Sequence, residues 1–148
     1  NTEIGFKNVH PFYSKMMTKK LFKYFIYPYE NTWNQVASLK KVLATTNLEA
    51  FEKEYFEMVG FDDYQSYCKA INPIYVLENI KIPLMVLNAE DDPVCSIKNL
   101  EPYKEVIQQM ENIAVVTTKK GSHCGFYESL EVKSWASRLM ADFFKHYS

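Results

Sequence analysis

Two short polar segments carry the residues best suited to chemistry. The first, Asp91-Asp92-Pro93, places two carboxylates side by side, and the second, residues 121–126, contains His123. A histidine can take up a proton and return it, and a carboxylate beside it can fix the imidazole tautomer and stabilise the charged ring. An acid and a histidine 31 positions apart therefore predict acid–base chemistry, provided that the fold brings them together.

Each polar segment directly follows an apolar run that is typical of a buried strand. Residues 84–88 precede the acids, and residues 113–118 precede the histidine loop. A helix is expected between the two runs, at about residues 99–110, so the order strand, helix, strand predicts a parallel pair with a right-handed crossover. Both polar loops then leave the carboxyl ends of neighbouring strands, where the functional groups of such sheets gather.

Only one of the two adjacent acids can meet the histidine, because neighbouring side chains point apart. We favour Asp92, since the Asp-Pro-Val that follows the strand turns the chain sharply and aims this carboxylate back over the sheet. Asp91 is the alternative, and both acids could instead form a solvated turn that caps the next helix.

The histidine loop has its own sequence signal. His123 lies between Gly121 and Gly125, which let the backbone bend so that the ring projects from the loop. Taken alone, His123 could be an ordinary loop histidine, whereas the order acid then histidine favours a functional pair. His10 and His146 lack this context, so we expect them at the surface.

A nucleophile and a metal site are both missing from the pattern. No serine has glycine at positions −2 and +2, as a nucleophile elbow requires. Cys95 and Cys124 do not occupy such an elbow, and with His123 they lack the CxxC or HxxxH spacing of a metal site. We therefore predict Asp92 and His123 as the catalytic residues, with no metal and no cofactor.

The amino-acid composition limits the class of protein, the partners and the compartment that the sequence allows. The 148 residues fit one domain, and 47% hydrophobic with 24% charged residues is typical of a globular protein. A net charge of −1 argues against nucleic acid as a partner, and no apolar run approaches the ~18 residues of a membrane span. Three cysteines without framework spacing favour a cytosol-like compartment, although the localisation stays open. The first residue, Asn1, suggests a piece of a longer protein, whose missing segment could carry a membrane anchor.

The first half of the chain is predicted to be helical. Apolar residues recur every three or four positions in 11–29, 31–44, 47–59 and 61–70, and a closing helix is expected at about 130–147. The aromatic helices form either an ordinary core or a cap that supplies an apolar pocket. Two parallel strands alone do not make a stable sheet, so we expect further strands from a missing segment or self-association through the open edge.

The second half resembles the C-terminal part of an α/β hydrolase, in the branch of the YheT-type hydrolases and the abhydrolase-domain esterases and phospholipases. The pattern I-x-I-P…N-A-x-D-D-P in residues 80–93, together with G-S-H-C-G-F in residues 121–126, carries most of this resemblance. Weaker matches lie in the helical stretches 51–56, 60–64 and 67–73. Ser122 replaces a more usual glycine, and Cys68 stands where the family often has a tyrosine.

The resemblance implies both a fold and an activity. Asp92 would be the triad acid and His123 the triad base, on the last two core strands of an α/β fold. Residues 1–79 would form a helical cap or insertion, and residues 80–148 the strands, the two loops and the closing helix of one partial domain. The implied function is serine-type hydrolysis of a carboxylic or lipid ester, with the serine in the missing N-terminal half and the isolated chain inactive. The alternative is a non-catalytic module with a degenerate hydrolase fold that binds an apolar ligand or a partner.

Overall fold

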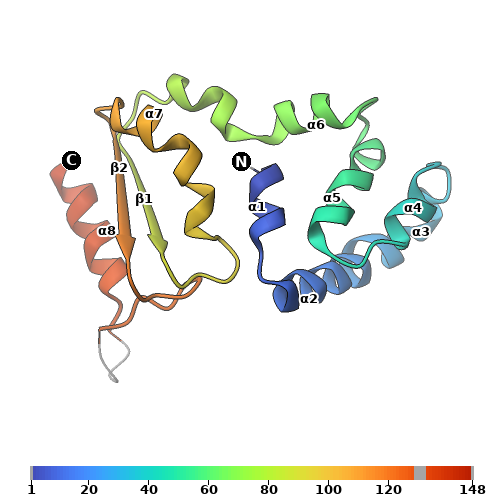
Figure 1. Cartoon of the computed structure of the whole chain (residues 1–148), viewed down its shortest axis with the longest axis horizontal. Helices are drawn as coiled ribbons and strands as arrows, with labels where there is room; N and C mark the ends of the chain where they lie inside the picture. Colours follow the sequence, from blue (N-terminus) through green and yellow to red (C-terminus); the bar gives the residue numbers. More distant parts are fainter. Residues whose placement is uncertain (1, 129–132, 148) are drawn as a thin grey trace. The chain divides into compact units, whose positions relative to one another are not determined.

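The computed structural model describes residues 2–128 and 133–147 (Figure 1). The chain divides into two compact units, Asn1–Tyr75 and Val76–Ser148, which we call unit 1 and unit 2. None of the helices in the described ranges combines the length and the apolar character that a membrane crossing needs.

Unit 1 is built from short helices. They are α1 (Thr2–Asn8), α2 (Pro11–Leu21), α3 (Glu30–Trp33), α4 (Leu39–Leu43), α5 (Leu48–Tyr55) and α6 (Tyr64–Ile71), with a π-helical segment (Phe22–Ile26) and 3-10 segments (Tyr27–Tyr29, Phe56–Val59 and Pro73–Asn79, the last of which runs into unit 2). Helix α5 packs against α1, α2 and α4. Around it lies a core of buried apolar side chains, namely Phe22, Ile26, Leu39, Val42, Phe51 and Met58.

Helix α5 and its 3-10 extension fill the predicted segment 47–59, whereas α6 starts at Tyr64 and not at residue 61 as predicted. The Asn47 side chain caps α5 by accepting the Ala50 N–H, and the Asp63 side chain caps α6 by accepting the Ser66 N–H. Gly60 ends the 3-10 extension of α5 with a left-handed φ of 89°. These ends depend on local hydrogen bonds, which a sequence pattern can indicate.

The predicted continuous helix at 31–44 is wrong. The structure has α3 and α4 there, separated by turns at residues 34–38. The break lets Trp33 and Val36 pack against the same core that Leu39 enters from α4. The first helical segment, predicted at 11–29 with Pro28 near its end, also does not stop there: Pro28 lies in the 3-10 segment Tyr27–Tyr29, and the helical path continues into α3.

Unit 2 contains the predicted parallel strand pair. Strands β1 (Leu84–Ala89) and β2 (Ile113–Thr118) pair in register from Leu84 opposite Ile113 to Ala89 opposite Thr118. They form a two-stranded sheet in the described part of the chain, and in the view of Figure 1 they stand between α7 (Lys104–Gln108) and α8 (Trp135–His146). The α/β character of the fold is therefore confirmed.

Both helices of unit 2 are shorter than predicted. In place of one helix at 99–110, two 3-10 segments (Ile97–Asn99 and Glu101–Tyr103) precede α7. Pro102 lies at the start of the second 3-10 segment; it has no N–H to donate and disfavours an α conformation for the residue before it. The closing helix starts at Trp135 because the extended Ser134 caps it by accepting the Ser137 N–H. Its predicted first positions, residues 130–132, lie outside the described residues.

Candidate active site

The acid loop begins where β1 ends at Ala89. The Glu90 N–H donates to the Thr118 carbonyl and extends the strand pairing by one bond. The Asp92 N–H then donates back to the Ala89 carbonyl and closes a turn. This turn brings the Asp92 side chain back over the carboxyl end of the strand pair.

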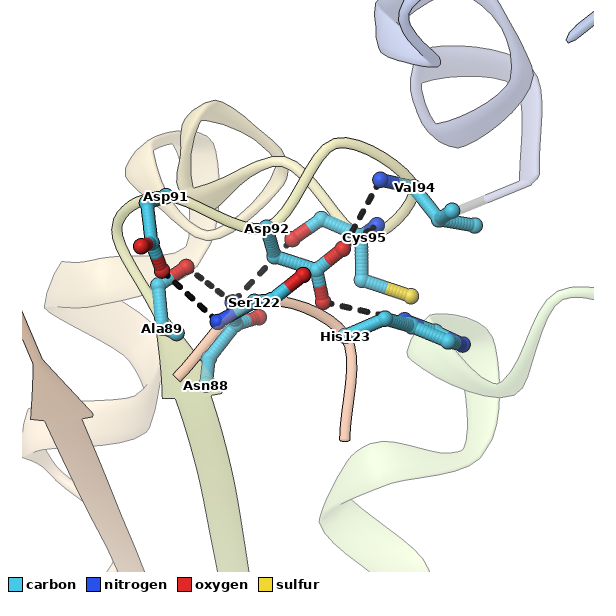
Figure 2. Close-up of polar contacts among 8 residues, drawn as sticks. All are labelled: Asn88, Ala89, Asp91, Asp92, Val94, Cys95, Ser122 and His123. Carbon is cyan, nitrogen blue, oxygen red and sulfur yellow. Dashed lines mark hydrogen bonds and ion pairs between the residues drawn. The ribbon is translucent and has the colours of Figure 1, made fainter. Parts of the chain in front are cut away.

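The carboxylate of Asp92 divides its two oxygens between the loop and the histidine. Oδ1 accepts the backbone N–H groups of Val94 and Cys95, each at 2.8 Å, and Oδ2 lies 3.0 Å from His123 Nδ1 (Figure 2). The Asp92 side chain is only 5% exposed, whereas the His123 side chain is 50% exposed. The predicted contact between the two side chains is thus present.

The pKa of Asp92 reflects opposing influences. Burial raises it, but the two backbone hydrogen bonds from Cys95 and Val94 and the contact with His123 favour the charged form, so the pKa lies below its ordinary value. The group is therefore a carboxylate at neutral pH. A carboxylate only accepts hydrogen bonds, so His123 Nδ1 carries the proton of this contact and Nε2 is left as the basic nitrogen.

The histidine loop is held tightly against the end of β1. A Cβ atom on Gly121 would come within 2.5 Å of the Phe126 ring and 3.0 Å of Ala89 Cβ, so only glycine fits this contact without a shift. The Gly125 N–H donates to the Gly121 carbonyl at 2.7 Å and closes the turn. Between them Ser122 has a φ of 48°, in the left-handed region that favours glycine.

Asp91 has a role that sequence reasoning missed. Its Oδ1 accepts the Ser122 N–H at 2.8 Å, and its Oδ2 lies 3.8 Å from Lys120 Nζ. Figure 2 shows the two neighbouring acids directed to different parts of the same loop. Asp91 therefore holds the backbone next to His123, while Asp92 holds the ring.

Two further residues at the site were also missed. The Asn88 amide donates to the carbonyls of Ala89 and Cys95, each at 3.0 Å, and so holds the acid loop closed. Cys95 Sγ, a carboxylate oxygen of Asp92 and a ring nitrogen of His123 all lie within 4.8 Å of one another. Asn88 belongs to the N-A-x-D-D-P pattern, which could have indicated it, but nothing in the spacing indicates Cys95.

The other histidines lie outside this cluster. His10 is exposed and caps α2, its Nδ1 lying 3.4 Å from the Phe12 N. His146 is exposed near the end of α8, with its ring against Tyr147. Both are at the surface, as expected.

Unit 1 contains an apolar pocket of about 530 Å³ between α1, α2, α5 and α6. Its walls include Phe6, Met17, Phe51 and Tyr55, and the buried Glu52 also lines it. Glu52 accepts a short hydrogen bond from the Tyr64 hydroxyl. The volume is in the range of small-molecule sites.

Parallel strands with an ionised acid and a histidine at their carboxyl ends are an arrangement that α/β hydrolases use. Relatives of the chain agree with this class. The chain is 31% identical over 90 residues to abhydrolase domain-containing protein 2 of Drosophila melanogaster, and 30% identical over 86 residues to medium-chain fatty acid ethyl ester synthase/esterase 2 of Saccharomyces cerevisiae. It is 26% identical over 104 residues to the human monoacylglycerol lipase ABHD2.

These matches cover 60%, 58% and 68% of the chain, but only 23%, 18% and 24% of the respective relatives. The chain thus spans about a quarter of the length of these relatives, or less. No family model matches the chain, and no solved structure matches it significantly. Its homologues are abhydrolase domain-containing proteins and an esterase, at low identity, which is consistent with a partial α/β hydrolase.

Proposed function

We propose that this chain carries the acid and the histidine of a serine-type ester hydrolase and forms the C-terminal portion of its α/β-hydrolase fold. The observation that carries the proposal is the 3.0 Å contact between Asp92 Oδ2 and His123 Nδ1 beside two paired strand ends. The names of an esterase and a monoacylglycerol lipase among the relatives support a carboxylic or lipid ester as the substrate.

In the proposed mechanism Asp92 stays ionised throughout. Its carboxylate accepts a hydrogen bond from the Nδ1–H of His123, so the ring offers Nε2 to the serine hydroxyl. The serine oxygen bonds to the ester carbonyl as its proton moves to Nε2, and that proton then leaves with the alcohol as the ester bond breaks. In the second half of the reaction a water gives one proton to Nε2 as its oxygen bonds to the acyl carbon. Nε2 then returns that proton to the serine oxygen as the acyl–serine bond breaks, which releases the acid and restores the serine. The serine and the oxyanion donors belong to a segment outside this chain.

The test uses the longer protein that contains this chain, with a p-nitrophenyl ester as substrate. His123→Ala should lower kcat/KM by at least ~10²–10⁴-fold, because the base is lost. His146→Ala is the matched control, since this exposed histidine lies at the end of α8, and it should leave kcat/KM unchanged. Full activity in His123→Ala would contradict the proposal.

The isolated chain gives a second test. Without a serine elbow it should hydrolyse the ester no faster than free imidazole, and a fluorophosphonate probe should label none of its serines. Stoichiometric labelling of a serine in the chain would show that the chain itself contains the nucleophile. It would contradict the proposal that the catalytic serine lies in another segment.

A non-catalytic module is the second candidate function, and the apolar pocket of unit 1 favours it. A pocket of about 530 Å³ whose walls are mainly aromatic and aliphatic could hold an apolar ligand without any chemistry. Retention of a fluorescent fatty acid by a longer protein that shows no ester hydrolysis would favour this candidate. Hydrolysis that depends on His123 would exclude it as the main function.

The open edges of the sheet in unit 2 favour pairing with a further segment or with a second copy of the chain. Its two strands leave edges with unpaired N–H and C=O groups in the described part of the chain. We propose that the missing N-terminal half covers them in the longer protein, and that the isolated chain self-associates through them. Light scattering that shows a stable monomer of the isolated chain would contradict this proposal.

A further inference from the structure

We propose that Asp92, Cys95 and His123 form a binding site for a divalent transition-metal ion, with Zn²⁺ as the preferred ion. The three side chains offer a carboxylate oxygen, a thiol sulfur and a ring nitrogen within 4.8 Å of one another. These are the three ligand types that Zn²⁺ takes in proteins. The spacing of the residues does not indicate this site, because Cys95 lies three residues after the acid and far along the chain from the histidine.

The geometry is close to that of a zinc site. Ligand atoms at bond lengths of ~2.0–2.3 Å around a tetrahedral ion lie about 3.3–3.6 Å from each other. Asp92 Oδ2 and His123 Nδ1 are 3.0 Å apart, so the ion needs these two atoms to separate only slightly. Cys95 must bring its sulfur closer by on the order of 1 Å. Its side chain is exposed and can turn to do so.

Neighbouring groups on the acid loop hold two of the ligands, Asp92 and Cys95, in place. Backbone N–H groups occupy Oδ1 of Asp92 and leave Oδ2 for the ion. The Asn88 amide holds the Cys95 carbonyl, and so holds the cysteine on the same short loop as the acid. Contacts of this kind orient the ligands of metal sites. Exposure of the cysteine and the histidine leaves a fourth coordination position for water.

Binding exchanges one proton for the ion. The thiol of Cys95 releases a proton to solvent, and Asp92 is already ionised. The neutral His123 ring moves its single proton from Nδ1 to Nε2 by exchange with solvent. A ring that holds the ion through Nδ1 and carries its proton on Nε2 can no longer accept a proton from a nucleophile. Resting on the proposed function, this predicts that Zn²⁺ inhibits ester hydrolysis by locking the wrong tautomer.

The binding test needs no activity. Zn²⁺ is titrated into the chain against a chromophoric chelator in the presence of a phosphine reductant. One equivalent should bind, and Cys95→Ser or His123→Ala should each weaken binding by more than the ~10–100-fold that loss of an outer contact produces. Cys124→Ser is the matched control, because this exposed cysteine adjoins His123 but is outside the cluster, and it should leave the affinity unchanged.

Co²⁺ gives an independent signature. The wild-type chain and Cys124→Ser should show a thiolate-to-cobalt charge-transfer band that Cys95→Ser lacks. Retention of the band and of the Zn²⁺ affinity in Cys95→Ser would overturn the site, as would their loss in Cys124→Ser. Zinc binding without any ester hydrolysis in the longer protein would leave the site in place and refute the proposed function alone.

Discussion

The two units of the chain are held together in different ways. Unit 1 has a contiguous apolar core in which Ile26 and Val42 are almost completely buried. In unit 2 the buried apolar residues among those described are Ala89 and Ala136, and the side chains of β1 are mostly half-buried. Unit 2 instead concentrates long-range polar contacts between its acid and histidine loops. The comparison suggests that packing stabilises unit 1, whereas polar contacts fix the site in unit 2.

A matched pair of substitutions tests this difference, and it has the largest expected effect. Val42→Ala in α4 should lower the free energy of unfolding of unit 1 by about 2 kcal/mol, because it removes two buried methyl groups and leaves a cavity. Val86→Ala in β1 makes the same chemical change at a half-buried position and should lower that of unit 2 by less than about 1 kcal/mol.

The two tryptophans allow each unit to be followed separately. Trp33 lies in unit 1 and Trp135 in unit 2, so urea denaturation of Trp135→Phe and Trp33→Phe backgrounds reports one unit each. An equal loss of stability from the two valine substitutions would contradict the comparison.

The polar contacts of unit 2 can be broken at Asp91. Asp91→Ala removes the acceptor of the Ser122 N–H, so the exchange of this amide hydrogen should accelerate by about tenfold or more. Asp91→Asn keeps an acceptor oxygen and should have a smaller effect. Asp62→Ala, at an exposed acid of unit 1, serves as the control. Unchanged exchange in Asp91→Ala, measured by NMR, would show that Asp91 does not hold the loop.

Acid should weaken the Asp92 contacts in a definite pH window. The pKa of Asp92 is lowered in the folded chain, so its contribution to stability is complete above the ordinary aspartate pKa of about 3.9 and is lost as the pH falls through the lowered value. The difference in unfolding free energy between wild type and Asp92→Asn should therefore shrink below about pH 4. Trp135 fluorescence in the Trp33→Phe background measures it, and a difference independent of pH would contradict this assignment.

The smallest expected effect comes from substitutions at a residue of positive φ in each unit, Gly60 in unit 1 and Ser122 in unit 2. Gly60 has a φ of 89° and open space where the Cβ atom of an alanine would lie, so Gly60→Ala should destabilise unit 1 by about 1 kcal/mol from backbone strain alone. Ser122 has a φ of 48°, and Ser122→Gly should stabilise unit 2 by no more than about 0.5 kcal/mol, since relief of strain is partly offset by glycine's greater flexibility. Opposite signs in urea denaturation are the expected result, and a destabilising Ser122→Gly would contradict it.

The sequence predicted what local chemistry determines. Strands β1 and β2 follow from apolar runs, and α5 and α6 from the helical spacing of apolar residues in 47–59 and 61–70. The Asp92–His123 contact followed because both loops leave parallel strands at the same end. The parallel pairing of the strands followed from the order strand, helix, strand.

The remaining features depend on contacts between distant residues. The break between α3 and α4 reflects the packing of Trp33 and Val36 on the core of unit 1, which helical periodicity does not indicate. The contact of Asp91 with the Ser122 backbone joins residues 31 positions apart, and the approach of Cys95 to the pair depends on how the acid loop closes. Neither of these two contacts can be predicted from the spacing of residues in the sequence.

The most direct test of the account is a double-mutant cycle on kcat/KM for ester hydrolysis in the longer protein, with wild type, Asp92→Asn, His123→Ala and the double variant. If Asp92 acts through His123, the acid substitution lowers kcat/KM strongly in the wild-type background and hardly at all once the histidine is gone, so the double variant matches His123→Ala. Independent effects that multiply in the double variant would contradict the claim that the two residues act as a unit.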